Sequence, residues 1–146
     1  MQVSTTKKNV LTGLIIVTLC FIWGNSLMPG TISSAISDWV GSILSKILGS
    51  AVDTSAGHGV LRKLAHGTEY LILGLELTVM LRLWKRRPWS LVILSGLSAA
   101  LIDETIQLFV AGRSSQIRDV WIDLGGFLTG IVLCILISKI HKQQKK

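Results

Sequence analysis

The segment from residue 61 to residue 77 restricts the fold of this chain more than any other part of the sequence. It is rich in leucine, and five of its residues recur at offsets of four, seven, eleven and fourteen: Arg62, His66, Glu69, Leu73 and Glu76. In an α-helix these offsets place four ionisable side chains along one stripe and leave leucines on the opposite face. An ionisable residue inside a bilayer costs at least about 2.5 kcal/mol. If the segment spans a membrane, the stripe must therefore face other protein or trapped water.

The composition favours an integral membrane protein over a soluble one. Of the 146 residues, 49% are hydrophobic and 16% are charged, and the mean hydropathy is +0.58. A chain of this length forms one domain, residues 1–146. The formal net charge is +7, but the basic residues fall in short clusters between apolar runs, so we expect no nucleic-acid partner. Cys20 and Cys134 lie within apolar runs, which predicts no disulfide.

Four apolar segments predict an all-α integral membrane fold with four transmembrane helices, at residues 9–28, 63–82, 89–110 and 119–138. Between the first two spans, a short amphipathic helix is predicted over residues 31–49. Its isoleucines and Trp39 recur at helical spacing, while serines, Asp38 and Lys46 occupy the other positions. Such a helix lies in the membrane interface or covers one end of the bundle. Residues 50–59, which include His58, are predicted to form a loop, and residues 111–117 a tight turn.

The distribution of Lys and Arg predicts the orientation of the chain in the cell membrane. Basic clusters at residues 7–8, 82–87 and 139–146 fall on one side, so both termini of this multi-pass protein are predicted to be cytoplasmic. At ~1.5 Å of rise per helical residue, polar residues of three spans then lie at one depth, in the outer third of the bilayer. Only Glu76 lies deeper.

Small residues share helix faces with this polar cluster on two of the spans. The third span has one such face, formed by Gly96, Ala100, Asp103 and Gln107. The fourth span has another, formed by Asp119, Asp123, Gly126 and Gly130. Small residues let two membrane helices approach closely, above all as the GxxxG pair of Gly126 and Gly130. Both faces are therefore predicted to contact neighbouring helices.

Two interpretations of the polar cluster stay open. In the structural one, the arginines at positions 62, 113 and 118 pair with carboxylates of neighbouring spans and hold the helices together. In the functional one, the cluster is a site open to the outer leaflet. Its candidate catalytic residues are His66, Glu69, Asp103 and Glu104. Its candidate ligand-binding residues are Arg62, Gln107, Arg113, Arg118, Asp119 and Asp123. For a functional site, we expect neutral replacements of His66, Glu104 and Arg113 to abolish function and leave the fold stable.

The cluster also offers donors for a metal ion or an anion. The side chains of His66, Glu69, Asp103 and Glu104 suit zinc or manganese. The spacing of these four is no specific signature, and no second histidine lies nearby, so the sequence predicts no metal and no other cofactor. Arg113 and Arg118, beside two serines, suit a phosphate or carboxylate head group, and pairing with Asp119 is the alternative.

Three ordered motifs resemble those of the VanZ-like membrane proteins. They are Arg62-Lys63-Leu64-Ala65-His66-x-x-Glu69-Tyr70-x-x-Leu73-Gly74, Asp103-Glu104-x-x-Gln107, and Gly112-Arg113-x-x-x-x-Arg118-Asp119-Val120-x-x-Asp123-x-x-Gly126. The segment from Asn25 to Gly30 is similar to the first segment of that family, so the resemblance covers most of the chain from Trp23 to Gly130. Gly67 stands where an aromatic residue is common, and Ala111 where proline is common.

The resemblance implies a function in the cell envelope. VanZ-like proteins are associated with reduced susceptibility to teicoplanin-type glycopeptides, whose fatty tails anchor them at the outer membrane face. This implies binding or alteration of a membrane lipid or a lipid-linked wall precursor at the outer leaflet. A lipoglycopeptide itself is a further candidate partner, and a homodimer is an open alternative.

Two rival functions belong to other classes. The first is a membrane-embedded hydrolase or transferase acting on a lipid head group, with His66 as acid and base and Asp103 or Glu104 as its partner. The second is a small proton-coupled lipid transporter, in which Glu76 connects the cluster to the inner side. The sequence has no GxSxG elbow, P-loop or HExxH motif, so it predicts no particular class of enzyme.

Overall fold

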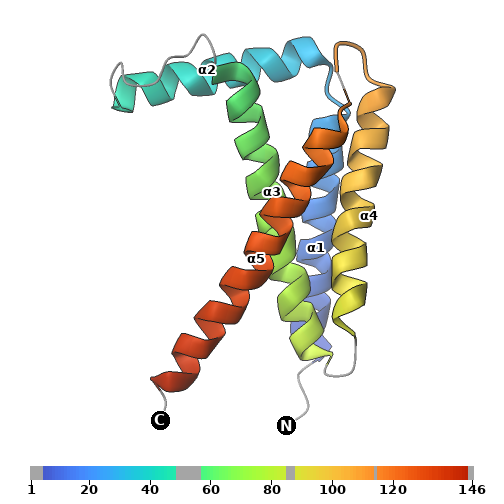
Figure 1. Cartoon of the computed structure of the whole chain (residues 1–146), viewed down its shortest axis with the longest axis vertical. Coiled ribbons are helices and arrows are strands. Elements are labelled where there is room, and N and C mark those ends of the chain that lie inside the picture. The colour runs from blue at the N-terminus through green and yellow to red at the C-terminus, as the bar shows by residue number, and fades with distance from the viewer. Residues whose placement is uncertain (1–4, 49–56, 85–87, 114, 145–146) are drawn as a thin grey trace.

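The structure is a computed structural model of the chain and describes residues 5–48, 57–84, 88–113 and 115–144. Within these ranges the regular elements are all α-helices: α1 (Thr5–Ser26), α2 (Gly30–Leu48), α3 (Gly57–Leu83), α4 (Trp89–Leu108) and α5 (Ile117–Gln143) (Figure 1). The predicted all-α fold is therefore confirmed for the part of the chain that the structure describes.

Four of the helices form a bundle, and α2 lies across one end of it. In Figure 1, α1 and α4 run side by side, α3 descends next to them, and α5 crosses α3 obliquely. The most extensive contact between two elements is that of α3 with α5. The two termini both lie at the end of the bundle opposite α2 (Figure 1). We call the other end, where α2 crosses, the α2 end.

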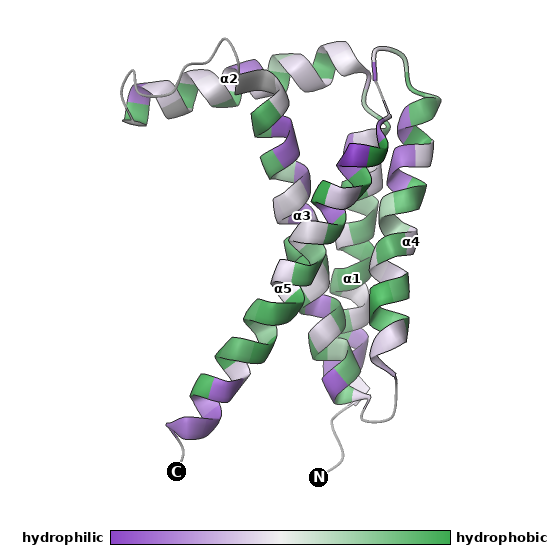
Figure 2. Ribbon diagram, viewed as in Figure 1, coloured by the Kyte–Doolittle hydropathy of each residue, from purple (hydrophilic) through white to green (hydrophobic). Residues whose placement is uncertain are grey.

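Three helices are long and apolar enough to cross a membrane, namely α1, α4 and α5. Their outer faces expose large apolar side chains, among them Val17 and Phe21 on α1, Leu101 on α4 and Val132 on α5. Figure 2 shows the hydrophobic colour over the middle of α4 and α5, with hydrophilic residues toward the helix ends. Soluble proteins rarely expose such extended apolar surface, whereas lipid requires it.

α3 departs from the other long helices in composition. It has 27 residues, as many as α5, but the polar stripe of the sequence interrupts its apolar face. The prediction of four spans is therefore supported by length and composition for three helices. The predicted amphipathic helix corresponds to α2, which follows Pro29 and exposes Ile32, Ile36 and Trp39 along its length.

The start of α2 is joined to the connection between α4 and α5. The Gly30 amide donates a hydrogen bond to the Ala111 carbonyl, at 3.0 Å. A Cβ atom on Gly30 would overlap the Gly112 carbonyl, and Gly112 itself has φ +74°, a conformation that favours glycine. The two glycines therefore let two separate connections meet at the α2 end.

Glycine also permits the close contact of α3 with α5. A Cβ on Gly126 would overlap the backbone carbonyl of Gly67, and one on Gly130 would overlap that of Leu71. The predicted contact through the GxxxG pair is confirmed. The predicted face of α4 is confirmed as well, because Gly96, Ala100, Asp103 and Gln107 are all buried.

The largest difference from the predicted boundaries is at the start of α3. His58 was predicted to lie in a loop, but α3 begins at Gly57 and includes it. The glycines at positions 57 and 59 are poor helix formers, and the longer helix extends through them despite this local preference. Gly57 and Gly59 of the predicted loop belong to α3 as well, and residues 50–56 lie outside the described residues. So do the basic residues 85–87 and Ser114.

Candidate functional site

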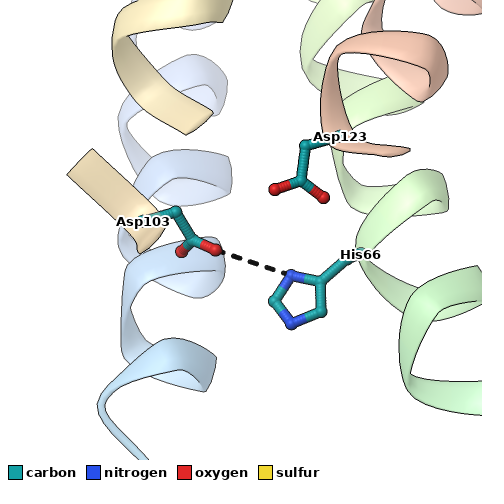
Figure 3. Close-up of side chains that lie close together, drawn as sticks. All are labelled: His66, Asp103 and Asp123. Carbon is teal, nitrogen blue, oxygen red and sulfur yellow. Dashed lines mark ion pairs between the residues drawn. The ribbon is translucent and has the colours of Figure 1, made fainter. Parts of the chain in front are cut away.

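Ionisable side chains of three helices converge inside the bundle, toward the α2 end. Figure 3 shows His66 from α3, Asp103 from α4 and Asp123 from α5 turned toward a common space. The His66 Nδ1 atom lies 3.7 Å from Asp103 Oδ2 and 3.9 Å from Glu69 Oε2. One potential ligand atom from each of His66, Asp103 and Asp123 lies within 4.8 Å of the other two. We call His66, Glu69, Asp103 and Asp123 the His66 cluster.

α1 supplies two polar partners for the cluster that the candidate residues did not include. The Asn25 side-chain amide donates to Glu69 Oε1 at 2.7 Å. The Gln107 amide donates to Asp103 Oδ2 at 3.0 Å, and Ser26 Oγ lies 3.2 Å from the same nitrogen. The sequence signal for these partners was that Asn25 and Ser26 are adjacent polar residues at the end of an apolar span. Asn25 therefore orients the Glu69 carboxylate directly, and Ser26 acts on Asp103 through the Gln107 amide.

Glu104 has a different position from its neighbour Asp103. Its Oε2 atom accepts hydrogen bonds from Ser115 Oγ at 2.7 Å and from the Gln116 backbone amide at 2.9 Å. Gln116 immediately precedes α5, so Glu104 holds the start of that helix against the end of α4. This contact gives Glu104 a structural role, and it leaves Asp103 as the carboxylate of α4 that faces His66.

Arg113 binds the end of α1. Its Nε donates to the Met28 carbonyl at 3.0 Å and its Nη2 to the Asn25 carbonyl at 2.7 Å. A cation is favourable there because the carbonyls at a helix C-terminus carry partial negative charge. Burial, and secondly the positive charge of Arg62, lower the pKa of the Arg113 guanidinium. Two cationic side chains are therefore held close enough to repel each other.

The ion pairs of the described residues differ from those of the structural interpretation. No arginine in the described ranges lies within ion-pair distance of the buried carboxylates of α3, α4 and α5, and Asp119 pairs with Lys63 at 3.6 Å instead. Arg118 is exposed in the first turn of α5. Among the described residues, arginine–carboxylate pairing therefore does not account for the polar cluster.

Several buried polar atoms at the site have no hydrogen-bond partner in the described part of the chain. They are His66 Nδ1, Glu69 Oε2, Asp103 Oδ1, Glu104 Oε1, Arg113 Nη1, Asp119 Oδ1 and Asp123 Oδ2. Buried polar atoms in native proteins usually have partners, because an unpaired one costs about 1–3 kcal/mol. So many at one place indicate a site that binds water, an ion or a polar ligand.

Two cavities adjoin the cluster. The larger, about 290 Å³, lies between α1, α2 and α3. Its wall is mostly apolar and includes Phe21, Ile36 and Val40, whereas its polar lining consists of Asn25, Ser33, Ser37, Arg62, His66, Glu69 and Arg113. The smaller, about 10 Å³, is lined by Arg62, Lys63, His66, Glu104, Gln107, Asp119, Ile122 and Asp123. Of the candidate residues in the described ranges, only Asp103 and Arg118 line neither cavity. We call the larger cavity the α2 pocket.

Comparison with known proteins gives one match. A family model described as VanZ/LLP1 matches residues 10–138, a range that includes every residue of the two cavities. No curated protein matches the chain. No solved structure matches it either.

Proposed function

Because this chain belongs to the VanZ/LLP1 family, we propose that it is a multi-pass protein of the cell membrane that binds a lipid or lipid-linked envelope precursor at the outer leaflet. Such binding would reduce susceptibility to teicoplanin-type lipoglycopeptides, which act at the same membrane face. The observation that supports this function best is the α2 pocket, where an apolar wall and two arginines line one cavity of about 290 Å³.

α3 is the fourth span in this proposal. Its polar stripe faces the bundle: Glu76 accepts a hydrogen bond from Thr18 Oγ1 at 3.0 Å, and Glu69 accepts one from Asn25. Both termini lie at one end of the bundle, as an even number of spans requires (Figure 1). The basic residues at positions 7, 8, 82, 139 and 142 belong to the helix ends farthest from α2. The positive-inside rule then places the termini in the cytoplasm and the α2 pocket outside.

Cysteine labelling tests this orientation. In a chain with both native cysteines replaced by alanine, Lys46→Cys and Gln116→Cys should react with a membrane-impermeant maleimide on intact cells. Lys7→Cys should react only after the cells are permeabilised. Labelling of Lys7→Cys on intact cells, with protection of the other two, would reverse the orientation and place the pocket in the cytoplasm.

The ligand class follows from the pocket lining. Guanidinium groups bind phosphate in a planar, often bidentate geometry, and charge-assisted hydrogen bonds of this kind are stronger than neutral ones. Arg62 and Arg113 both line the α2 pocket, and the Arg113 Nη1 atom has no hydrogen-bond partner among the described residues. An anion between the two would also relieve their mutual repulsion. The apolar wall provides a surface for the first part of a lipid chain. An anionic lipid, with phosphate or pyrophosphate as its head group, therefore fits best.

Arg62→Gln should weaken the binding of such a lipid. A hydrogen bond to a charged group contributes about 1.5–3 kcal/mol, so we expect Kd to rise at least about tenfold. The measurement is calorimetric titration of the purified protein in nonionic detergent with a short-chain isoprenyl phosphate. The same titration with the corresponding isoprenyl alcohol should show little binding to either protein.

Lys46→Gln is the matched control for that experiment. It removes one positive charge from an exposed position on α2 that does not line the pocket. Binding by this variant should equal that of the unmodified protein. If Arg62→Gln binds the phosphate as tightly as Lys46→Gln does, the α2 pocket is not the head-group site.

A second candidate function is supported by the position of His66. This residue lines the α2 pocket and lies 3.7 Å from Asp103, a buried carboxylate that can orient an imidazole. A membrane-embedded hydrolase or transferase would use His66 as acid and base on the head group, with Asp103 as its partner. Glu104 is less suited, because it already accepts two hydrogen bonds. Turnover of the head group by the purified protein distinguishes this enzyme from a binding protein.

A further inference from the structure

We propose that His66, Asp103 and Asp123 bind one divalent transition-metal ion, of the zinc or manganese class, in the centre of the bundle. The proposal stands on the geometry of these three side chains and does not depend on the lipid proposed above. It also differs from the four donors that the sequence suggested, since Asp123 takes part and Glu69 and Glu104 do not.

The geometry of the three side chains is close to that of a metal site. They come from three different helices and point into one space (Figure 3). Two ligands bound tetrahedrally to zinc at about 2.0–2.2 Å lie roughly 3.4 Å apart. The His66 Nδ1 and Asp103 Oδ2 atoms are 3.7 Å apart, and one ligand atom of each of the three residues lies within 4.8 Å of the others. Small side-chain movements would bring all three into a coordination sphere.

A second observation points to a ligand at this place. Asp103 has 0% and Asp123 has 2% of its surface exposed, yet Asp103 Oδ1 and Asp123 Oδ2 have no hydrogen-bond partner among the described residues. His66 Nδ1 is unpartnered as well. Two deeply buried carboxylates facing each other can both be ionised only beside a cation, and His66 is the one potentially cationic side chain within ion-pair distance of them among the described residues. A divalent cation bound by the three side chains would satisfy His66 Nδ1 and Asp123 Oδ2 and compensate the negative charge of both carboxylates.

The donor set indicates the class of metal. One imidazole with carboxylates suits zinc, manganese or iron, whereas magnesium and calcium prefer oxygen ligands alone. The Gln107 amide donates a hydrogen bond to Asp103 Oδ2. Hydrogen bonds from residues that do not themselves bind the metal commonly orient metal-binding carboxylates in this way. The small cavity beside His66 and Asp123 has a volume of about 10 Å³, which is about the least space that can hold one water molecule. A water could therefore be the fourth ligand.

Metal analysis of the purified protein tests the proposal. The protein in detergent is treated with a chelator, passed over a sizing column, and mixed with zinc, manganese or magnesium. We expect one zinc or manganese ion per chain after desalting, and no retained magnesium. At a zinc concentration about a hundred times Kd, the unfolding temperature should rise by roughly 5–10 °C.

Variants locate the site. His66→Gln and Asp123→Asn should lose the bound metal and its effect on the unfolding temperature. Glu76→Gln is the matched control, because it neutralises a carboxylate of α3 that hydrogen-bonds to Thr18 outside the cluster, and it should retain the metal. Arg62→Gln should also retain it, which separates this proposal from that of lipid binding. Equal metal content in Asp123→Asn and in the unmodified protein would overturn the assignment.

X-ray absorption keeps the test independent of how the variants fold. The spectrum of the zinc-loaded, unmodified protein should show one imidazole nitrogen and oxygen ligands. A spectrum with sulfur ligands, which would come from a cysteine, or with oxygen ligands alone would contradict the proposal. So would an unmodified protein that is folded and monodisperse and retains no metal.

Discussion

Gly126→Leu should separate α3 from α5 and leave a chain that does not fold stably in detergent. Even the first atom of a side chain at this position would overlap the backbone carbonyl of Gly67. Backbone cannot move aside as a flexible side chain can, so the two helices would have to part along their most extensive contact. Overpacking of side chains costs about 1–3 kcal/mol, and we expect more than about 3 kcal/mol here. The measurements are thermal unfolding and size-exclusion chromatography of the purified variant.

The neighbouring residue provides the control. A Cβ on Gly125 would meet no atom within 4 Å, so Gly125→Leu places the same side chain on a face that contacts no other helix. Both substitutions replace a glycine within α5 and gain the same intrinsic helix propensity. Gly125→Leu should therefore unfold at or above the temperature of the unmodified protein. Equal stability of the two variants would mean that α3 and α5 do not pack as described.

Arg113→Ala should have the second largest effect, a loss of about 3–5 kcal/mol of stability. It removes two charge-assisted hydrogen bonds to the carbonyls of Asn25 and Met28, and each contributes about 1.5–3 kcal/mol. Those bonds join the end of α1 to the connection that precedes α5. Thermal unfolding in detergent should show a decrease of roughly 10 °C or more.

Arg118→Ala is the comparison for Arg113→Ala. It removes the same side chain five residues later, from an exposed position, and should change stability by less than about 0.5 kcal/mol. If the two alanine variants unfold at the same temperature, Arg113 does not hold the end of α1.

The structure changes the expected effect of substitution on stability for two of three residues that the sequence predicted to behave in the same way. From sequence, His66, Glu104 and Arg113 were expected to be replaceable without loss of stability. The hydrogen bonds of Glu104 and Arg113 to the chain around them change that expectation for both. For His66 the expectation of unchanged stability still holds in the metal-free protein, because its Nδ1 atom forms no hydrogen bond with the described part of the chain.

Side-chain patterns predicted the helices and their contact faces well. The spacing of Gly126 and Gly130, and of Asp103 and Gln107, indicated faces that are buried in the structure. Such predictions succeed because helical periodicity is a local property of the sequence. The start of α2 is joined to the bundle by a backbone hydrogen bond from Gly30 to Ala111, and side-chain periodicity does not predict such a bond.

The partners within the polar cluster were also harder to predict, because side-chain periodicity does not determine them. Arg113 binds backbone carbonyls, which every residue carries, so nothing in the sequence distinguishes Asn25 and Met28 as its acceptors. The choice between Asp103 and Glu104 as the neighbour of His66 depends on rotation about the α4 axis. That rotation is set by packing against other helices, and adjacent residues in sequence then face different surroundings.

The polar stripe of α3 has a consequence for biosynthesis. Insertion machinery offers each segment to the lipid as it is made, and a charged residue near the middle of a span opposes transfer by about 2.5–3.5 kcal/mol. If α3 is a span, as proposed above, its Glu69 and Glu76 enter lipid favourably only beside their partners Asn25 and Thr18 on α1. The most extensive contact of α3 is with α5, the last helix to be synthesised. In that proposal α1 is already in place to receive the polar stripe when α3 is made, whereas the face of α3 that packs on α5 stays uncovered until translation of α5 is complete.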